Sequence, residues 1–208
     1  MIIIGVTGGV GTGKSIVARL FQRLGAEVFD ADQVAHRLME PGRPVWKKIR
    51  AEFGPEVLVR SGRINRQRLG HIVFRSRSRL KSLNRIVHPA VRRSILEDLK
   101  RLRRRRPNGV AVLDIPLLLE SGRAYRTDAV VVVTAPVREA ARRLEKRSGW
   151  PAREIKRRGS FQMPLREKVK KADFVVRNGG DLAATRRQVV RIWNKITGEG
   201  VHGRRKDD

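Results

Sequence analysis

The chain alternates short apolar runs with longer segments in which apolar residues recur every three or four positions. The first run, Met1 to Val6, is followed by such a segment from Gly13 to Gly25. A short apolar run predicts a buried strand, whereas recurrence at three or four positions predicts an amphipathic helix. Gly25 is a residue type that commonly ends helices. We therefore expect a strand, a loop and a helix, in that order.

Four further apolar runs are predicted to be strands. They lie at Ala26–Asp32, Val110–Leu119, Asp128–Pro136 and around Asp173. Because helical segments separate these buried runs, the pattern predicts a parallel sheet covered by helices on both faces. The expected fold class is α/β, with a sheet of about five strands.

Two long segments interrupt this alternation. Residues 33–106 have a mostly helical pattern, and so long an insertion favours a functional lobe over a simple connector. Residues 143–171 form a second excursion, rich in Arg and Lys. The last residues, 199–208, have little to bury and are expected to be loose. We expect one domain whose core comprises residues 1–32 and 107–200.

The composition narrows the choice of partners. Of 208 residues, 48 are Lys or Arg and 20 are Asp or Glu, which gives a formal net charge of +28. Such a charge attracts nucleic acids or small polyphosphates. The absence of cysteine excludes disulfides, thiolate metal sites and cysteine nucleophiles. No run is long and apolar enough to span a membrane, so we expect a cytoplasmic protein without a membrane partner.

The loop after the first strand carries the most specific pattern. Residues 8–15, GGVGTGKS, fit G-x-x-x-x-G-K-[ST] between a predicted strand and a predicted helix. In this pattern the backbone N–H groups, here those of Gly11, Thr12, Gly13, Lys14 and Ser15, cradle the phosphates of a nucleoside triphosphate. Lys14 would reach the β- and γ-phosphates, and the Ser15 hydroxyl would hold Mg²⁺. The alternative is a glycine-rich turn with an incidental lysine.

Two carboxylates follow the second predicted strand. Asp30 and Asp32 lie where strands of an α/β sheet end, which is where ligands bind in such folds. A carboxylate there could accept a proton from an attacking hydroxyl. Either residue could instead cap a helix starting near Gln33. The spacing alone does not decide between these roles.

Five segments together resemble a known family. In chain order they read TGGVGTGKS, DADQVAHRLMEPGRP, NRIVHPAVR, LDIPLLLESG and QMPLREKVKKADFVVRNGG. Over nearly the whole chain they are similar to the dephospho-CoA kinase family. The loop alone would not separate this family from other small kinases, but the DAD, HP and PLLLE segments do. The resemblance implies a P-loop kinase core with a helical substrate lobe at about 33–106 and a mobile lid at about 143–171.

The resemblance also implies a reaction and residue roles. The family transfers the γ-phosphoryl group of ATP to the ribose 3′-hydroxyl of dephospho-CoA, the last step of coenzyme A synthesis. Asp32 matches the second Asp of the DAD motif, taken as the base, while His88 matches the HP motif and is treated as structural. Asp114 would hold Mg²⁺, directly or through water, unless it caps a helix. Arg147 matches a lid arginine closing over the phosphoryl group, unless it is a solvated surface charge.

Three positions depart from the family pattern. Ile16 stands where Thr commonly follows GKS, which removes a possible contact to the α-phosphate but keeps the backbone donor. Ile16 is therefore still counted among the nucleotide-binding residues. Ser148 and Arg177 replace residues that are commonly acidic, and they leave the proposed chemistry untouched.

Two other functions compete with this interpretation. One is a P-loop kinase acting on another nucleoside or nucleotide. The other is a basic nucleic-acid-binding protein, suggested by the runs Arg103–Arg106, Arg157–Arg158 and Arg204–Lys206. No recognised nucleic-acid-binding module is visible, and aromatic residues for base stacking are few. The expected partners are ATP and dephospho-CoA, with Mg²⁺ as cofactor and no specific nucleic acid.

Overall fold

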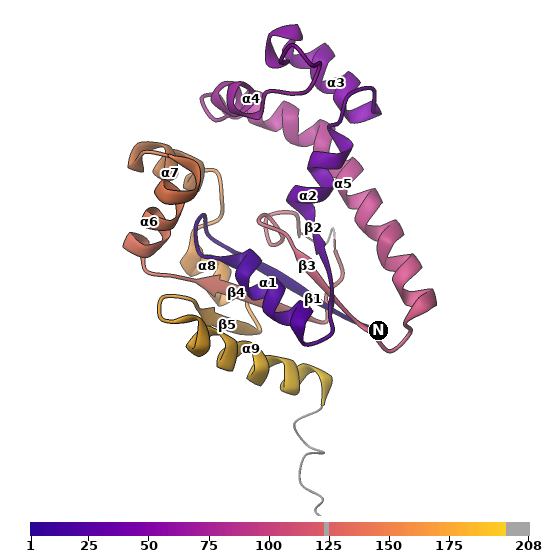
Figure 1. Cartoon of the computed structure of the whole chain (residues 1–208), viewed down its shortest axis with the longest axis vertical. Coiled ribbons are helices and arrows are strands. Elements are labelled where there is room, and N and C mark those ends of the chain that lie inside the picture. Colours follow the sequence, from indigo (N-terminus) through magenta and orange to yellow (C-terminus); the bar gives the residue numbers. More distant parts are fainter. Residues whose placement is uncertain (123–124, 199–208) are drawn as a thin grey trace, which may run out of the picture. The chain divides into compact units, whose positions relative to one another are not determined.

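The computed structural model describes residues 1–122 and 125–198, so the expected loose tail at 199–208 lies outside the described residues (Figure 1). The chain forms two compact units. The sheet unit comprises Met1–Phe29 and the chain from Leu102, and the helical unit comprises Asp30–Arg101. In the described part of the chain, no helix is both long and apolar enough to cross a membrane.

A five-stranded parallel sheet forms the centre of the sheet unit. In chain order the strands are β1 (Ile2–Gly8), β2 (Glu27–Asp30), β3 (Val110–Asp114), β4 (Ala129–Thr134) and β5 (Phe174–Arg177). Their spatial order is β2-β3-β1-β4-β5, and β1 pairs in parallel with β3 and β4. The predicted α/β fold class with about five strands is confirmed.

The register of β1 decides which loops meet at the carboxyl edge. Val6 pairs with Asp114 of β3, and Gly8 pairs with Val133 of β4. The loop that leaves β1 therefore starts beside the end of β3. In open α/β sheets this edge is the place where ligands bind.

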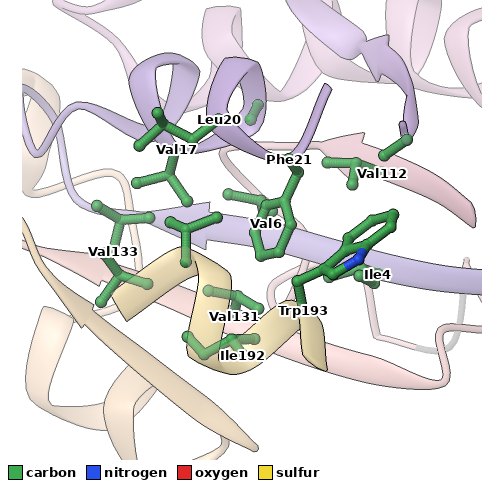
Figure 2. Close-up of a cluster of buried hydrophobic side chains, with 14 of the residues drawn as sticks. Ile4, Val6, Val17, Leu20, Phe21, Val112, Val131, Val133, Ile192 and Trp193 are labelled. Atoms are coloured by element: carbon green, nitrogen blue, oxygen red, sulfur yellow. The ribbon is translucent and has the colours of Figure 1, made fainter. Parts of the chain in front are cut away.

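One face of the sheet is covered by helices α1 (Lys14–Arg23) and α9 (Leu182–Thr197). Their apolar side chains pack on alternate residues of the strands, as Figure 2 shows for Val6, Val112 and Val131. The rings of Phe21 and Trp193 lie 6.4 Å apart between centroids. Burial of each such side chain contributes about 1.5–3 kcal/mol, so this layer fixes α1 behind the loop.

The chain between β4 and β5 forms α6 (Val137–Ser148), α7 (Ala152–Gly159) and α8 (Leu165–Lys170). Helix α8 packs on β4. On the sheet face opposite to Ile4 and Val6, a Cβ atom at Gly5 would overlap the Leu118 side chain. The turn after β3 therefore packs closely on β1. The role of residues 143–171 as a lid stays a prediction.

The helical unit contains α2 (Ala31–Leu38), α3 (Pro44–Phe53), the 3₁₀ helix η1 (Pro55–Val57), α4 (Arg66–Val73) and most of α5 (Arg77–Arg105). The Asn65 side chain caps α4, since it accepts hydrogen bonds from the N–H groups of Gln67 and Arg68 at 3.1 and 3.0 Å. The sequence predicted a division after residue 32 and before 107, whereas the units divide after Phe29 and before Leu102. A substrate-binding role for this unit stays a prediction.

Two predicted element ends are wrong by a few residues. The second strand ends at Asp30, and the next helix starts at Ala31 instead of Gln33. The third strand ends at Asp114 and does not continue to Leu119. Residues 116–121 form turns instead, because Pro116 has no N–H group to continue a strand ladder.

Candidate active site

The loop between β1 and α1 has a backbone that only glycine fits well. Gly11 and Gly13 adopt φ angles of 77° and 85°, in the left-handed region. A Cβ atom at Gly11 would also overlap the Ala140 carbonyl and the Leu144 side chain, and one at Gly13 would overlap the Asn178 amide nitrogen. Both glycines are therefore required by conformation and by close packing.

The loop presents N–H groups at the start of α1. The Ile16 and Val17 N–H groups donate to the Gly13 carbonyl, where the helix ladder begins. Within the described residues, no acceptor meets the N–H groups of Lys14 and Ser15. First-turn N–H groups at the positive end of a helix are ready donors for an anion. This arrangement suits the predicted phosphate cradle.

Lys14 is half-buried at the first position of α1. No carboxylate of the described residues forms an ion pair with its ammonium group. Burial lowers the pKa of Lys168, and the charge of Lys14 lowers it further. The hydrogen bond and charge of Glu120 raise the pKa of Lys168 in the opposite direction, so the repulsion from Lys14 is partly offset by this carboxylate.

The structure brings the two predicted metal ligands together. The Ser15 hydroxyl donates a 3.1 Å hydrogen bond to Oδ2 of Asp114, which is 4% exposed. Asp114 ends β3 and is followed by turns, so it does not cap a helix. A hydroxyl and a carboxylate offer the hard oxygen ligands that Mg²⁺ prefers, and Mg²⁺ commonly takes one or two protein ligands plus phosphate oxygens. Their chemistry fits a nucleotide-bound Mg²⁺, although metal binding stays a prediction.

Hydrogen bonds at the start of α2 distinguish Asp30 from Asp32, whose roles the sequence left open. Oδ1 of Asp30 accepts hydrogen bonds from the N–H groups of Asp32 and Gln33, at 2.8 and 3.1 Å, and thereby caps α2. Asp32 lies in the first turn of that helix, with an exposed side chain. Asp30, and not Asp32, is therefore the residue that caps α2, and the role of Asp32 as a base stays a prediction.

The other residues singled out by sequence analysis are Ile16, Arg147 and His88. Ile16 is 39% exposed on α1, so its side chain is not part of the core. Arg147 lies near the end of α6, but its side chain is outside what the structure describes. The prediction that Arg147 contacts the transferred phosphoryl group therefore stays a prediction. His88 lies within α5, directly before Pro89.

Sequence analysis did not predict a buried amide that holds the loop. The Asn178 side chain donates a 2.8 Å hydrogen bond to the Thr12 carbonyl, and its own oxygen accepts one from the Thr185 hydroxyl at 3.1 Å. Asn178 and Thr185 are 3% and 0% exposed. The available signal was a polar residue directly after β5, at the same sheet edge as the loop.

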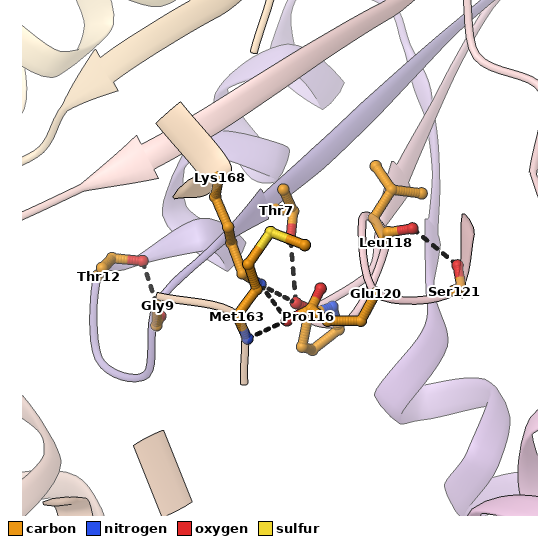
Figure 3. Close-up of polar contacts among 9 residues, drawn as sticks. All are labelled: Thr7, Gly9, Thr12, Pro116, Leu118, Glu120, Ser121, Met163 and Lys168. Carbon is orange, nitrogen blue, oxygen red and sulfur yellow. Dashed lines mark hydrogen bonds and ion pairs between the residues drawn. The ribbon is translucent and has the colours of Figure 1, made fainter. Parts of the chain in front are cut away.

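A second unpredicted network lies beside the loop (Figure 3). The Lys168 ammonium, on α8, donates to the Pro116 carbonyl at 2.7 Å and pairs with Glu120 at 2.9 Å. The same Glu120 carboxylate accepts from the Met163 N–H group at 2.9 Å, and the Thr7 hydroxyl donates to the Pro116 carbonyl at 3.0 Å. These contacts join β1, the turn after β3 and α8. Lys168 and Glu120 belong to two motifs of the sequence, but their pairing is visible only in the fold.

Arg143 of α6 also approaches the loop. Its Nη1 atom is buried and has no hydrogen-bond partner within the described residues. This atom lies 3.5 Å from the position that a Cβ atom of Gly13 would take. Nothing in the sequence distinguishes Arg143 from the other Lys and Arg residues, 48 in all.

Comparison with known proteins decides the family. The family model described as dephospho-CoA kinase matches residues 2–184. The chain belongs to the dephospho-CoA kinase family. A dephospho-CoA kinase of Geobacillus kaustophilus is 44% identical over 196 residues, which cover 93% of this chain and 97% of that protein. The resemblance seen in the five sequence segments is thereby confirmed.

Solved structures agree with this family and with its fold. The Thermus thermophilus protein TT1252 has a TM-score of 0.78 at 38% identity, covering 93% of this chain and 96% of its own. A dephospho-CoA kinase from Campylobacter jejuni has a TM-score of 0.67 at 29% identity, covering 95% of this chain and 98% of its own. The same α/β architecture therefore extends over nearly the whole chain.

Proposed function

We propose that this chain is a dephospho-CoA kinase, which transfers the γ-phosphoryl group of ATP to the ribose 3′-hydroxyl of dephospho-CoA. The products are coenzyme A and ADP, so the reaction completes coenzyme A synthesis. Membership of the family over residues 2–184 is the observation that carries this proposal. Its partners are ATP and dephospho-CoA, and its location is the cytoplasm.

The glycine-rich loop would bind the triphosphate. The N–H groups of Gly11, Gly13, Lys14 and Ser15 would provide donors for the phosphate oxygens, whereas those of Thr12 and Ile16 already donate to the Gly9 and Gly13 carbonyls. Lys14 would provide a positive charge for the β- and γ-phosphates. The orphan N–H groups of Lys14 and Ser15 and the close packing at Gly13 support this role. Phosphoryl transfer requires mainly positioning and charge neutralisation, and a rigid cradle supplies both.

Mg²⁺ is the cofactor that this site would hold with ATP. Ser15 and Asp114 would be its protein ligands, Asp114 directly or through water, and their 3.1 Å contact supports the assignment. When bound, Mg²⁺ neutralises charge on the β- and γ-phosphate oxygens. The hydrogen bond from Ser15 to Asp114 holds the two oxygen groups beside each other.

Asp32 would orient the 3′-hydroxyl and accept its proton. The cap that Asp30 supplies supports this role, because it leaves the Asp32 carboxylate outside the helix-capping hydrogen bonds. Arg147 would neutralise charge on the transferred group when the lid segment, residues 143–171, closes and excludes water. The helical unit would hold the acceptor.

The direct test uses the full chain with ATP, Mg²⁺ and a panel of acceptors: dephospho-CoA, adenosine, nucleoside monophosphates and shikimate. Mass spectrometry should detect coenzyme A from dephospho-CoA, and chelation of Mg²⁺ should stop its formation. Lys14→Met should abolish turnover and weaken ATP binding, whereas Lys47→Met, an exposed lysine of α3, should leave both unchanged. Phosphorylation of another acceptor, with dephospho-CoA left unreacted, would contradict the proposal.

A further inference from the structure

A cationic hollow lies wholly within the helical unit. Its volume is about 510 Å³, and it lies between α2, the turn that follows α2, and the segment that leads into α4. Its polar lining includes His36, Arg37, Glu40, Arg63 and Arg66. This volume is within the range of ~300–1,000 Å³ typical of small-molecule sites.

Positively charged side chains outnumber negatively charged ones in the lining of the hollow. Within the described residues, no carboxylate forms an ion pair with Arg37, Arg63 or Arg66. Glu40, the acidic residue of the lining, pairs at 3.1 Å with Arg43, which does not line the hollow. Three arginines around one hollow therefore favour an anion, and guanidinium groups bind phosphate oxygens through paired hydrogen bonds.

The hollow is one helical turn from Asp32. His36 follows Asp32 by four positions on α2, so the two side chains are neighbours on one helix face, roughly 6 Å apart along its axis. Burial lowers the pKa of His36, the charge of Arg66 lowers it further, and the charges of Asp32 and Asp30 raise it. The pKa of His36 therefore responds to the charge of Asp32, the predicted base, and to the charge of Arg66, which lines the hollow.

We propose that this hollow binds the diphosphate group of the acceptor and so places the ribose 3′-hydroxyl at Asp32. This inference rests on the proposed function and adds the residues that select the acceptor, a nucleoside 5′-diphosphate ester. The 5′-phosphate and the 3′-hydroxyl lie on opposite sides of one sugar ring, a separation that suits one turn of α2. Arg63 and Arg66 hold the phosphates, and Arg37 adds positive charge.

The test measures kinetics for each substrate separately in Arg63→Ala, Arg66→Ala and the double variant. A lost charge-assisted hydrogen bond corresponds to a change of about tenfold or more in affinity. We expect the KM for dephospho-CoA to rise by about that factor in each single variant and further in the double variant. The KM for ATP should not change. Arg66→Lys, which keeps the charge but loses the paired donors, should fall between Arg66→Ala and the natural protein.

Arg60→Ala is the matched control. Arg60 is an exposed arginine of the same segment that does not line the hollow, so its KM for dephospho-CoA should equal that of the natural protein. An unchanged KM for dephospho-CoA in the double variant of an active enzyme would overturn the inference. An equal rise in both KM values would overturn it as well. Failure of the natural protein to make coenzyme A would instead remove the proposed function.

Discussion

The Lys168 ammonium lies 2.9 Å from Oε1 of Glu120, and the lysine side chain has no exposed surface. A fully buried cation is costly unless its partners satisfy it. Here Glu120 supplies the opposite charge and the Pro116 carbonyl accepts a further hydrogen bond. The pair joins α8 to the turn that follows β3, beside the loop that carries Lys14.

Lys168→Met should therefore reduce the free energy of unfolding by about 3–5 kcal/mol, because it leaves the Glu120 carboxylate without its buried cation. Chemical denaturation at pH 7 measures the change. Lys170→Met is the matched control, because Lys170 lies on the same helix, is 71% exposed and pairs with Glu167 at the surface. The control should change stability by less than about 1 kcal/mol. Equal losses of stability in the two variants would show that the buried pair contributes no more than the surface pair.

The amide of Asn178 should control the shape of the nucleotide loop. Asn178→Asp replaces the donor to the Thr12 carbonyl with an oxygen that repels it, so we expect a loss of about 1–3 kcal/mol in stability. The KM for ATP should rise, because the loop is no longer held in place. Thermal unfolding and steady-state kinetics measure the two effects.

Two substitutions at Thr185 test the same hydrogen-bond network. Thr185→Ser keeps the hydroxyl that donates to Asn178, and Thr185→Val removes it at nearly the same volume. The Ser variant should retain the natural KM for ATP, and the Val variant should shift toward Asn178→Asp. If Ser and Val behave alike, the hydroxyl does not act through Asn178.

The neighbouring carboxylates Asp30 and Asp32 should respond differently to the same change. Asp32→Asn removes the proposed base, so turnover should fall by roughly 10² or more with a nearly unchanged KM for ATP. Asp30→Asn keeps a capping oxygen, and Asn caps helices about as well as Asp. Its turnover and stability should stay near those of the natural protein. Substantial turnover in Asp32→Asn would exclude Asp32 as the base.

His36 should make stability depend on pH. Burial and Arg66 place the pKa of His36 below its ordinary value of 6.5. In the interval from that lowered pKa up to 6.5, the unfolded chain binds more protons than the folded one, so stability rises as pH increases through it. His36→Gln lacks this contribution and should lose less stability than the natural protein between pH 7.5 and pH 5. Denaturation midpoints at both pH values test this. Parallel changes in the two proteins would contradict it.

The fold could be predicted where the relevant information is local. Consecutive β-branched residues such as those of β4 and the spacing of Val17, Leu20 and Phe21 determine strand and helix directly. The glycine-rich loop could be predicted for the same reason, because its pattern is contiguous. The apolar residues after Pro116 predict a longer third strand, but they form turns and the strand ends at Asp114.

The parts of the candidate site that could not be predicted depend on contacts between residues that are far apart in the sequence. Asp30 and Asp32 are chemically alike in the sequence, and the cap is assigned only by the hydrogen bonds that Asp30 accepts. Lys168 meets Glu120, and Asn178 meets Thr12, only after the sheet has assembled. In a chain with 48 Lys and Arg residues, charge alone could not single out Arg63, Arg66 or Lys168.

The hydrogen bond from Asn178 to the Thr12 carbonyl makes the P-loop depend on the last strand of the sheet. A fragment cut after β4 would contain every letter of the glycine-rich motif and still lack the amide that braces it. Residues 8–15 placed in another protein would also lack the Asn178 amide. We therefore expect phosphate binding by this loop to require the completed sheet and not the motif alone.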